Sequence, residues 1–341
     1  MKNITELILK LKNDPSPRVV ITTHHKPDAD ALGSSLGLYN FLKKFNVEVS
    51  VVSPTDYGDF LTWMPGEDTV INFEKEPEKA VSLALDASYI FCLDFNSLSR
   101  INDFGAVVAR SAAVKVLIDH HLEPANFDDY RYWNHRASST CELMYEFLCM
   151  YDKSSIGLDT AQCLYAGIMT DTGSFRFDTC TGKTHHVIAE LIDIGVKHHY
   201  IHEAIYDNFS ENRTRFIGYC ISNKLELLHE FNTALITVTS EELKKFNIVT
   251  GDTEGLVNYG LGIKGIKFAA LIIDRKVMVK MSFRSKGDFP ANQFASRHFN
   301  GGGHFNASGG QSDLSLPETV SKFKECLKEW KHILENQLVT Q

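Results

Sequence analysis

The sequence predicts an α/β protein with a doubly wound, mostly parallel sheet followed by a smaller mixed-sheet α/β domain. Three observations support this fold class. The 341 residues exceed what a single hydrophobic core usually holds, which favours two domains. In the first half, short apolar runs rich in β-branched residues alternate with helical patterns, as in parallel sheets. From residue 234 onward, strand-like runs joined by a hairpin turn at 274–276 replace this alternation.

The first predicted domain, residues 1–210, opens with an amphipathic helix at 3–12 and a buried strand at 18–23. Residues 31–44 return to helical spacing. Further strands are predicted at 47–52, 89–93 and 114–118, and further helices at 80–85, 159–169 and 185–207. A long helix at 211–230 is predicted to bridge the domains. The second domain, residues 231–341, has predicted strands at 234–238, 268–273 and 277–283, and helices at 241–246, 254–259, 292–298 and 317–334.

Composition limits the compartment and the partners. The formal net charge of −8 argues against a surface for long duplex nucleic acid. The seven cysteines form no Cys-x-x-Cys pair, a pattern typical of a reducing compartment. Charges interrupt the apolar runs at the N-terminus and elsewhere, so neither a signal peptide nor a membrane span is expected. We therefore expect a cytoplasmic protein with no membrane partner.

Acidic and histidine side chains follow three predicted strands at their carboxyl ends, and one more ends a predicted helix. They are His24, Asp28 and Asp30 after the first strand, Asp94 after 89–93, Asp119, His120 and His121 after 114–118, and Asp171. A single aspartate in such a place is often only a helix cap or a turn residue. Four clusters far apart in the sequence, each at the end of an element, indicate one functional site instead.

The residue types in these clusters suit a pair of divalent metal ions. Oxygen-rich ligation with imidazoles and no thiolate favours Mn²⁺, with Mg²⁺ as the alternative, over Zn²⁺. Two adjacent metals can polarise a phosphoryl oxygen and activate a water, so the expected reaction is hydrolysis of a phosphate ester or anhydride. The sequence contains no serine nucleophile elbow and no complete P-loop.

A second candidate site lies near the C-terminus. Gly301, Gly302 and Gly303 precede His304, and Arg284 lies at the end of a predicted strand. A run of glycines is usually a turn. Backbone amides of a glycine turn can also approach an anion closely, and arginine forms a bidentate pair with phosphate. Asn292 is a further candidate for this substrate-binding group.

The clusters, taken in this order, resemble the four motifs of the DHH phosphoesterase superfamily, named for the motif present here as residues 119–121. The C-terminal residues 282–285 and 301–304 resemble the DHHA1 domain that accompanies one branch of it. Length and layout are similar to the bifunctional oligoribonuclease and 3′-phosphoadenosine-5′-phosphate (pAp) phosphatase group. The resemblance covers nearly the whole chain.

The resemblance implies a role for each site residue. His24 and Asp28 are expected to hold one manganese, Asp30, His120 and Asp171 the other, and Asp94 to bridge them. His121 is expected to contact the scissile phosphate. Asp119 is expected to orient a metal ligand without binding the metal itself. The C-terminal turn with Arg284 is expected to bind the terminal phosphate or nucleotide portion of the substrate. His25 matches no required position and is interpreted as incidental.

The expected function is therefore that of a two-metal hydrolase. It would cleave short oligoribonucleotides to mononucleotides, convert pAp to AMP, or both. One alternative is a phosphodiesterase for pApA, the linear dinucleotide from cyclic di-AMP turnover. Another is a nucleotide sensor without catalysis, which the complete metal-ligand set argues against. The sequence leaves both a monomer and a homodimer open.

Overall fold

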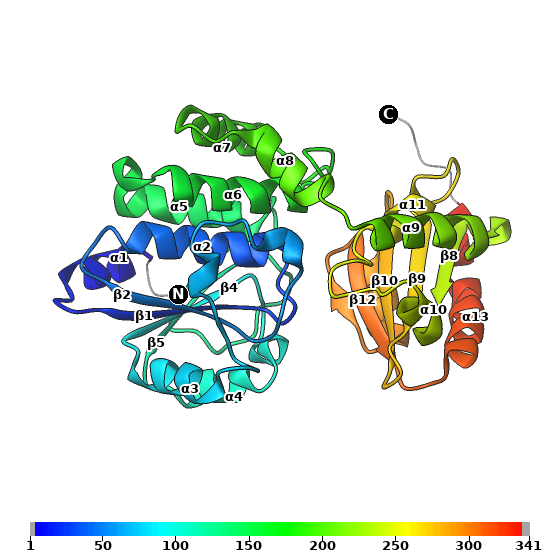
Figure 1. Cartoon of the computed structure of the whole chain (residues 1–341), viewed down its shortest axis with the longest axis horizontal. Coiled ribbons are helices and arrows are strands. Elements are labelled where there is room, and N and C mark those ends of the chain that lie inside the picture. Colours follow the sequence, from blue (N-terminus) through cyan, green and yellow to red (C-terminus); the bar gives the residue numbers. More distant parts are fainter. Residues whose placement is uncertain (1–3, 336–341) are drawn as a thin grey trace. The chain divides into compact units, whose positions relative to one another are not determined.

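Residues 4–335 are described by the computed structural model, and they form two compact units divided between Asn208 and Phe209 (Figure 1). The ends of the two predicted domains, residues 1–3 and 336–341, lie outside this description. The predicted first helix is present as α1 (Ile4–Asn13).

The first unit is built on a parallel sheet whose described strands number six, in the order β3-β2-β1-β4-β5-β6. These strands are β1 (Arg18–Thr23), β2 (Glu48–Ser53), β3 (Ile71–Asn72), β4 (Tyr89–Leu93), β5 (Val114–Asp119) and β6 (Tyr130–Trp133). This confirms the predicted parallel α/β class. The two strands that the sequence did not reveal, β3 and β6, are short and lie at the sheet edges.

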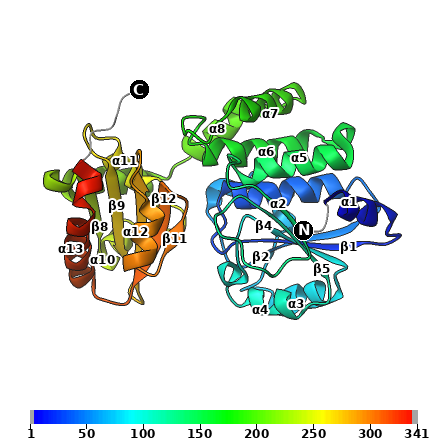
Figure 2. The ribbon, with the colours of Figure 1, turned by 180° about the vertical axis from the view of Figure 1, so that it is seen from behind.

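Helices cover both faces of this sheet. α1, α2, α5 and α6 lie on one face, and α3 and α4 lie on the other (Figures 1 and 2). Successive side chains of β1 point to opposite faces of the sheet. Ile21 packs into the hydrophobic cluster on one face, and Val20 packs into the cluster on the other. The remaining bounds are α2 (Ala29–Leu42), α3 (Pro77–Asp86), α4 (Phe104–Arg110), α5 (Thr140–Asp152), α6 (Leu158–Asp171), α7 (Gly182–Asp193) and α8 (His198–Tyr206). The single helix predicted at 185–207 is thus two helices, interrupted around Gly195.

The second unit is built on a mixed sheet, whose described strands are ordered β11-β12-β10-β9-β8-β7. β8 and β9 pair in parallel, and the other neighbours pair antiparallel. The strands are β7 (Leu225–Leu228), β8 (Thr233–Val238), β9 (Phe268–Asp274), β10 (Val279–Ser285), β11 (Gly302–Gly303) and β12 (Ala307–Ser312). The helices are α9 (Glu211–Asn223), α10 (Ser240–Lys245), α11 (Leu256–Leu261), α12 (Ala291–His298) and α13 (Leu316–Glu335). The predicted mixed-sheet α/β domain is confirmed.

The predicted bridging helix begins at residue 211 as expected, but its predicted end at 230 and its bridging role are wrong. α9 ends at Asn223, and residues 225–228 form β7, which pairs antiparallel with β8. Phe216 and Cys220 of α9 pack into the core of the second unit, so the helix belongs to that unit. The error arose because Leu225 and Leu227 continue an apolar pattern that fits a helix and an alternating strand equally well.

The predicted glycine turn is also displaced. Gly302 and Gly303 form β11 and pair with Gly309 and Ser308 of β12. The tight turn comes afterward, at residues 304–307, where the backbone amides of His304 and Ala307 each donate to the carbonyl oxygen of the other. The glycine run is therefore an edge strand leading into a hairpin. Among the described residues, no helix is both long and apolar enough to cross a membrane.

Candidate metal centre

The side chains predicted to converge do meet at one edge of the first sheet. β1, β4 and β5 are neighbours, so their carboxyl ends lie side by side. The N-terminal end of α2 and the C-terminal end of α6 reach the same place. The residues assembled here are His24, Asp28, Asp30, Asp94, Asp119, His120, His121 and Asp171.

One group of possible ligands consists of His24, Asp28 and Asp94, with one ligand atom of each lying within 4.8 Å of the others. His24 Nε2 lies 3.4 Å from Asp94 Oδ2 and 3.9 Å from Asp28 Oδ2. The other ring nitrogen, Nδ1, lies 2.8 Å from the carbonyl oxygen of His25, to which it can donate. A backbone partner of this kind fixes the tautomer and leaves Nε2 for a metal.

Asp28 has two roles, which explains why the sequence alone could not decide between a cap and a ligand. Its Oδ1 accepts hydrogen bonds of 3.0 Å from the backbone amides of Asp30 and Ala31, capping α2. Its Oδ2 is the atom facing His24. The cap therefore holds the second oxygen toward the cluster.

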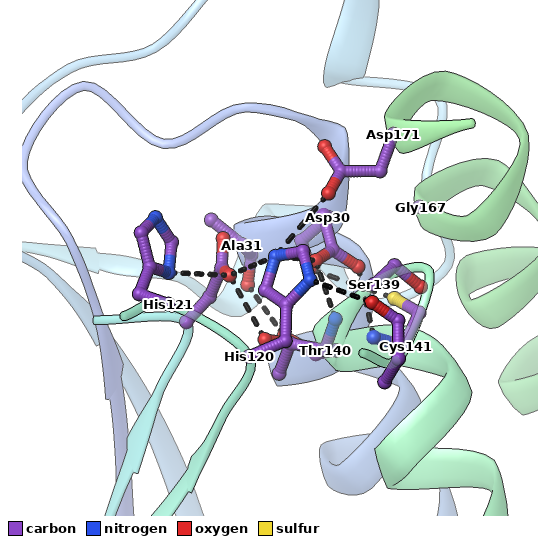
Figure 3. Close-up of polar contacts among 12 residues, drawn as sticks. Asp30, Ala31, His120, His121, Ser139, Thr140, Cys141, Gly167 and Asp171 are labelled. Carbon is purple, nitrogen blue, oxygen red and sulfur yellow. Dashed lines mark hydrogen bonds and ion pairs between the residues drawn. The ribbon is translucent and has the colours of Figure 1, made fainter. Parts of the chain in front are cut away.

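The second group consists of Asp30, His120 and Asp171 (Figure 3). His120 Nε2 lies 3.3 Å from Asp171 Oδ2 and 3.8 Å from Asp30 Oδ2. His120 Nδ1 lies 3.3 Å from the carbonyl oxygen of Ala137. Gly167 on α6 makes room for this group, because a Cβ there would lie 2.8 Å from Asp30 Oδ1.

Asp94 lies between the two groups. Its Oδ2 is the atom near His24, and its Oδ1 lies 3.6 Å from His120 Nε2. The backbone at Asp94 is left-handed, with φ of +63°, a conformation that non-glycine residues rarely adopt. Its amide donates a 3.1 Å hydrogen bond to Ile118 of β5, which holds this conformation in place. The strand end is thus bent so that one carboxylate faces both groups.

The N-terminus of α5 supports the carboxylates, a contribution that the sequence analysis missed. The backbone amides of Thr140 and Cys141 donate to the two oxygens of Asp30, at 2.7 and 2.8 Å. The Thr140 hydroxyl donates to Asp94 Oδ1 at 2.9 Å. The available signal was the run at 138–142, in which Ser139 caps the helix by accepting from the amide of Glu142.

Asp119 and His121 form a pair beside the cluster. Asp119 Oδ1 accepts hydrogen bonds from the His121 amide at 3.1 Å and from its ring Nδ1 at 2.8 Å. Burial opposes ionisation of Asp119, but the hydrogen bonds and charge of His121 outweigh it and lower the pKa of Asp119. The ionised carboxylate therefore fixes the orientation of the imidazole.

The electrostatics of the cluster favour a bound cation. Burial and the charges of Asp30 and Asp28 raise the pKa of Asp94 well above its ordinary value. Burial also raises the pKa of Asp30, although His120 opposes this effect. Burial lowers the pKa of His120, which favours the neutral imidazole that a metal requires. Crowded, buried carboxylates next to the imidazole of His120 fit divalent metal ions, because positive charge removes the repulsion among the carboxylates.

His25, interpreted from the sequence as incidental, makes specific hydrogen bonds beside the site. Its backbone amide and its ring Nδ1 both lie 2.8 Å from the carbonyl oxygen of Arg100. His25 thereby ties the loop after β1 to the loop after β4, the two loops that carry His24 and Asp94. Its carbonyl is also the partner of His24.

The predicted substrate-binding residues all lie in the second unit. Arg284 of β10 is paired in register with Ala307 of β12, and its Nη1 donates to the carbonyl of Phe283 at 2.9 Å. Gly302 and Gly303 pair with the other side of β12, and His304 follows them in the hairpin turn. Asn292 lies in the first turn of α12, where its Oδ1 accepts from the amide of Gln293 at 2.9 Å.

Comparison with known proteins agrees with this arrangement. The model of the "DHH family, N-terminal domain" matches residues 18–168, and that of the "DHHA1 domain" matches residues 232–334. The chain belongs to the DHH family. As a member of this family, the protein is a metal-dependent phosphoesterase, which is a hydrolase. It also carries a DHHA1 domain.

Relatives of this DHH protein cover almost its whole length. It is 29% identical to a probable bifunctional oligoribonuclease and PAP phosphatase of Streptococcus mutans, covering 90% of this chain and 93% of the relative. It is also 29% identical to the bifunctional oligoribonuclease and PAP phosphatase of Bacillus subtilis, covering 85% and 88%. The crystal structure of an exopolyphosphatase-related protein from Bacteroides fragilis is similar over 98% of both chains, with 39% identity and a TM-score of 0.92.

Proposed function

We propose that this protein uses two divalent metal ions, Mn²⁺ in preference to Mg²⁺, to hydrolyse short oligoribonucleotides to mononucleotides and pAp to AMP. The observation that carries the proposal is the placement of Asp94, whose two oxygens face His24 and His120. A carboxylate so placed suits a bridge between two ions. The names of the relatives from Streptococcus mutans and Bacillus subtilis support the substrate class.

In this proposal the chain's residues divide the work. His24 and Asp28 would hold one ion, Asp30, His120 and Asp171 would hold the other, and Asp94 would contribute an oxygen to each. When bound, the ions supply Lewis-acid polarisation of the phosphoryl group and activation of a water nucleophile. His121, oriented by Asp119, contacts the scissile phosphate and stabilises the charge that develops on it. Thr140 and Cys141 keep the carboxylate of Asp30 in position.

The second unit is proposed to recognise the nucleotide portion of the substrate through Arg284, His304 and the Gly301–Gly303 segment, with Asn292 as an additional contact. Arginine offers paired donors to a phosphate, and the backbone amides of the hairpin can approach an anion closely. The proposed substrate is short because the contacts proposed here involve only the scissile phosphate and one neighbouring nucleotide portion. Long duplex nucleic acid is not a proposed partner.

The proposal is tested by comparing turnover of pAp, pApA, short RNA oligomers and pyrophosphate in the same manganese-containing buffer. We expect the short RNA and pAp to be hydrolysed with the highest kcat/KM, and a chelator to abolish the activity. A clear preference for pApA would favour a role in cyclic dinucleotide turnover. A preference for pyrophosphate, or full activity in chelator, would contradict the proposal.

A further inference from the structure

An aromatic side chain lies beside the candidate metal centre and is not used in the chemistry described so far. Trp133 is the last residue of β6 and is paired in register with Asp119 at the end of β5. It is thus at the same carboxyl edge of the sheet as the cluster. Its indole Nε1 donates a 2.6 Å hydrogen bond to the backbone carbonyl of His121. This bond fixes the indole next to the histidine proposed to contact the scissile phosphate.

A second ring accompanies this indole. The ring centroids of Trp133 and His135 are 5.3 Å apart, with an interplanar angle of 33°. His135 is exposed and Trp133 is half-buried, so both residues are accessible to solvent. An indole with a fixed hydrogen bond, partly open to solvent at a functional edge, has the properties of a stacking surface.

We propose that Trp133 stacks against the nucleobase of the nucleotide whose phosphate is cleaved, with His135 as an adjustable neighbour. The proposal rests on the proposed function, because it assumes a nucleotide substrate. Every nucleobase has a π-face, so stacking gives affinity for nucleotides without selecting one base. The hydrogen bond from Nε1 keeps the indole ring close to His121, the residue proposed to contact the scissile phosphate. A nucleobase is separated from that phosphate by one sugar, so the base of a bound nucleotide would lie near this ring.

The same position has a purely structural interpretation, in which the indole N–H anchors the loop that carries His121. The two interpretations differ in what they require of residue 133. Anchoring requires the N–H group, whereas stacking requires an aromatic ring. Trp133→Phe keeps a ring and loses the N–H, and Trp133→Leu loses both.

The kinetic test uses pAp and its base-free analogue, ribose 3,5-bisphosphate. We expect Trp133→Leu to lower kcat/KM for pAp by roughly 5- to 150-fold, the range of one base–aromatic contact. The same variant should lower kcat/KM for the base-free analogue much less than for pAp, and Trp133→Phe should retain most of the activity on pAp. Equal losses on both substrates, with Phe as damaging as Leu, would overturn the proposal.

A binding test keeps the proposal falsifiable if Trp133→Leu does not fold. The chain has three tryptophans, and the others remain as a common background in Trp133→Phe. We expect AMP to quench the fluorescence of the wild-type protein and not that of Trp133→Phe, while ribose 5-phosphate quenches neither. AMP binding that is measurable by calorimetry without any difference in quenching would overturn the stacking site alone. Failure of AMP to bind, together with failure to hydrolyse any nucleotide, would overturn the proposed function as well.

Discussion

Asp94 shows how one residue can serve function at a cost to stability. It is buried, its backbone is left-handed, and its carboxylate is surrounded by other carboxylates. Burial and the neighbouring carboxylates raise its pKa, which means that the ionised form is less stable in the folded protein than in the unfolded chain. At neutral pH, without a bound cation, Asp94 therefore destabilises the fold.

The first prediction follows from this cost. Asp94→Asn should lose more activity than the ~10–100-fold typical of a residue that acts through a ligand, because a bridging carboxylate serves both ions. In chelator at neutral pH, the same variant should melt at a higher temperature than the wild type, since the buried charge is gone. Turnover in manganese measures the first effect, and thermal unfolding in chelator measures the second. A lower melting temperature of the metal-free variant, or near-normal rates, would contradict this role.

Thr140 is the residue that joins the two groups through hydrogen bonds. Its amide donates to Asp30 and its hydroxyl to Asp94. We predict that Thr140→Val, which removes only the hydroxyl, lowers manganese affinity and activity by about 10–100-fold, as expected for a group that orients a metal ligand. Thr140→Ser should restore both. Manganese binding is measured by calorimetry, separately from turnover.

A matched control for this variant is Thr160→Val. The Thr160 hydroxyl is also buried, but it has no hydrogen-bond partner among the residues that the structure describes. Its replacement should leave manganese affinity unchanged. If both valine variants weaken binding equally, the Thr140 hydroxyl has no specific role.

At the scale of elements, the site depends on which strands are neighbours and on which helix ends reach them. β1, β4 and β5 are adjacent, so residues separated by about a hundred positions in the chain meet at one edge. The N-termini of α2 and α5 then supply backbone amides to Asp28 and Asp30. Because amides at a helix N-terminus favour negative charge, two helix starts help to hold the carboxylates in the ionised form.

The β11–β12 hairpin provides a prediction at the same scale. A Cβ at Gly301 would lie 2.0 Å from the carbonyl oxygen of Gly309, whereas a Cβ at Gly302 would meet nothing within 4 Å. Gly301→Ala should therefore destabilise the second unit by roughly 1–3 kcal/mol, because the paired backbone has to shift. Gly302→Ala should leave stability unchanged and serves as the matched control. Denaturant unfolding of the two variants measures the difference.

The outcome at Gly302 also bears on the binding proposal. A loss of nucleotide affinity in the stable Gly302→Ala variant would support close approach of the substrate to this strand. Equal stability of the two alanine variants would contradict the packing argument for Gly301.

For the whole molecule, the two units carry different chemistry. Carboxylates and imidazoles gather in the first unit, while Arg284 and the hairpin with His304 belong to the second. In the proposed division of work, cleavage requires the first set and binding of a substrate phosphate requires the second, so the two functions should separate under mutation.

We predict that Arg284→Ala and His304→Ala each lower kcat/KM for nucleotide substrates by roughly ten- to a hundred-fold, the value of a charged hydrogen bond to phosphate, ~1.5–3 kcal/mol. Both should spare a small generic diester, which has no nucleotide portion to be recognised. The measurement is the ratio of kcat/KM for the two substrates in wild type and variant. An unchanged ratio would mean that the hairpin has no part in recognition.

The fold class and the carboxylates and imidazoles of the candidate site could be predicted from local patterns in the sequence. Apolar runs of strand length and helical spacing are local patterns, and acidic or histidine residues at their ends can be read without knowing the partners. Asp94 and residues 119–121 were found in this way. Edge strands such as β6 and β7 were missed, because they are short and their apolar pattern fits more than one structure.

The contacts among these residues could not be predicted in the same way, because they depend on the tertiary structure. The two oxygens of Asp28 have separate partners, Thr140 connects Asp30 to Asp94, and Trp133 lies against His121. Each of these contacts joins elements that are far apart in the chain or fixes the direction of a single atom. Local spacing carries no information about either, because both depend on which strands become neighbours and on how closely the helices pack against them.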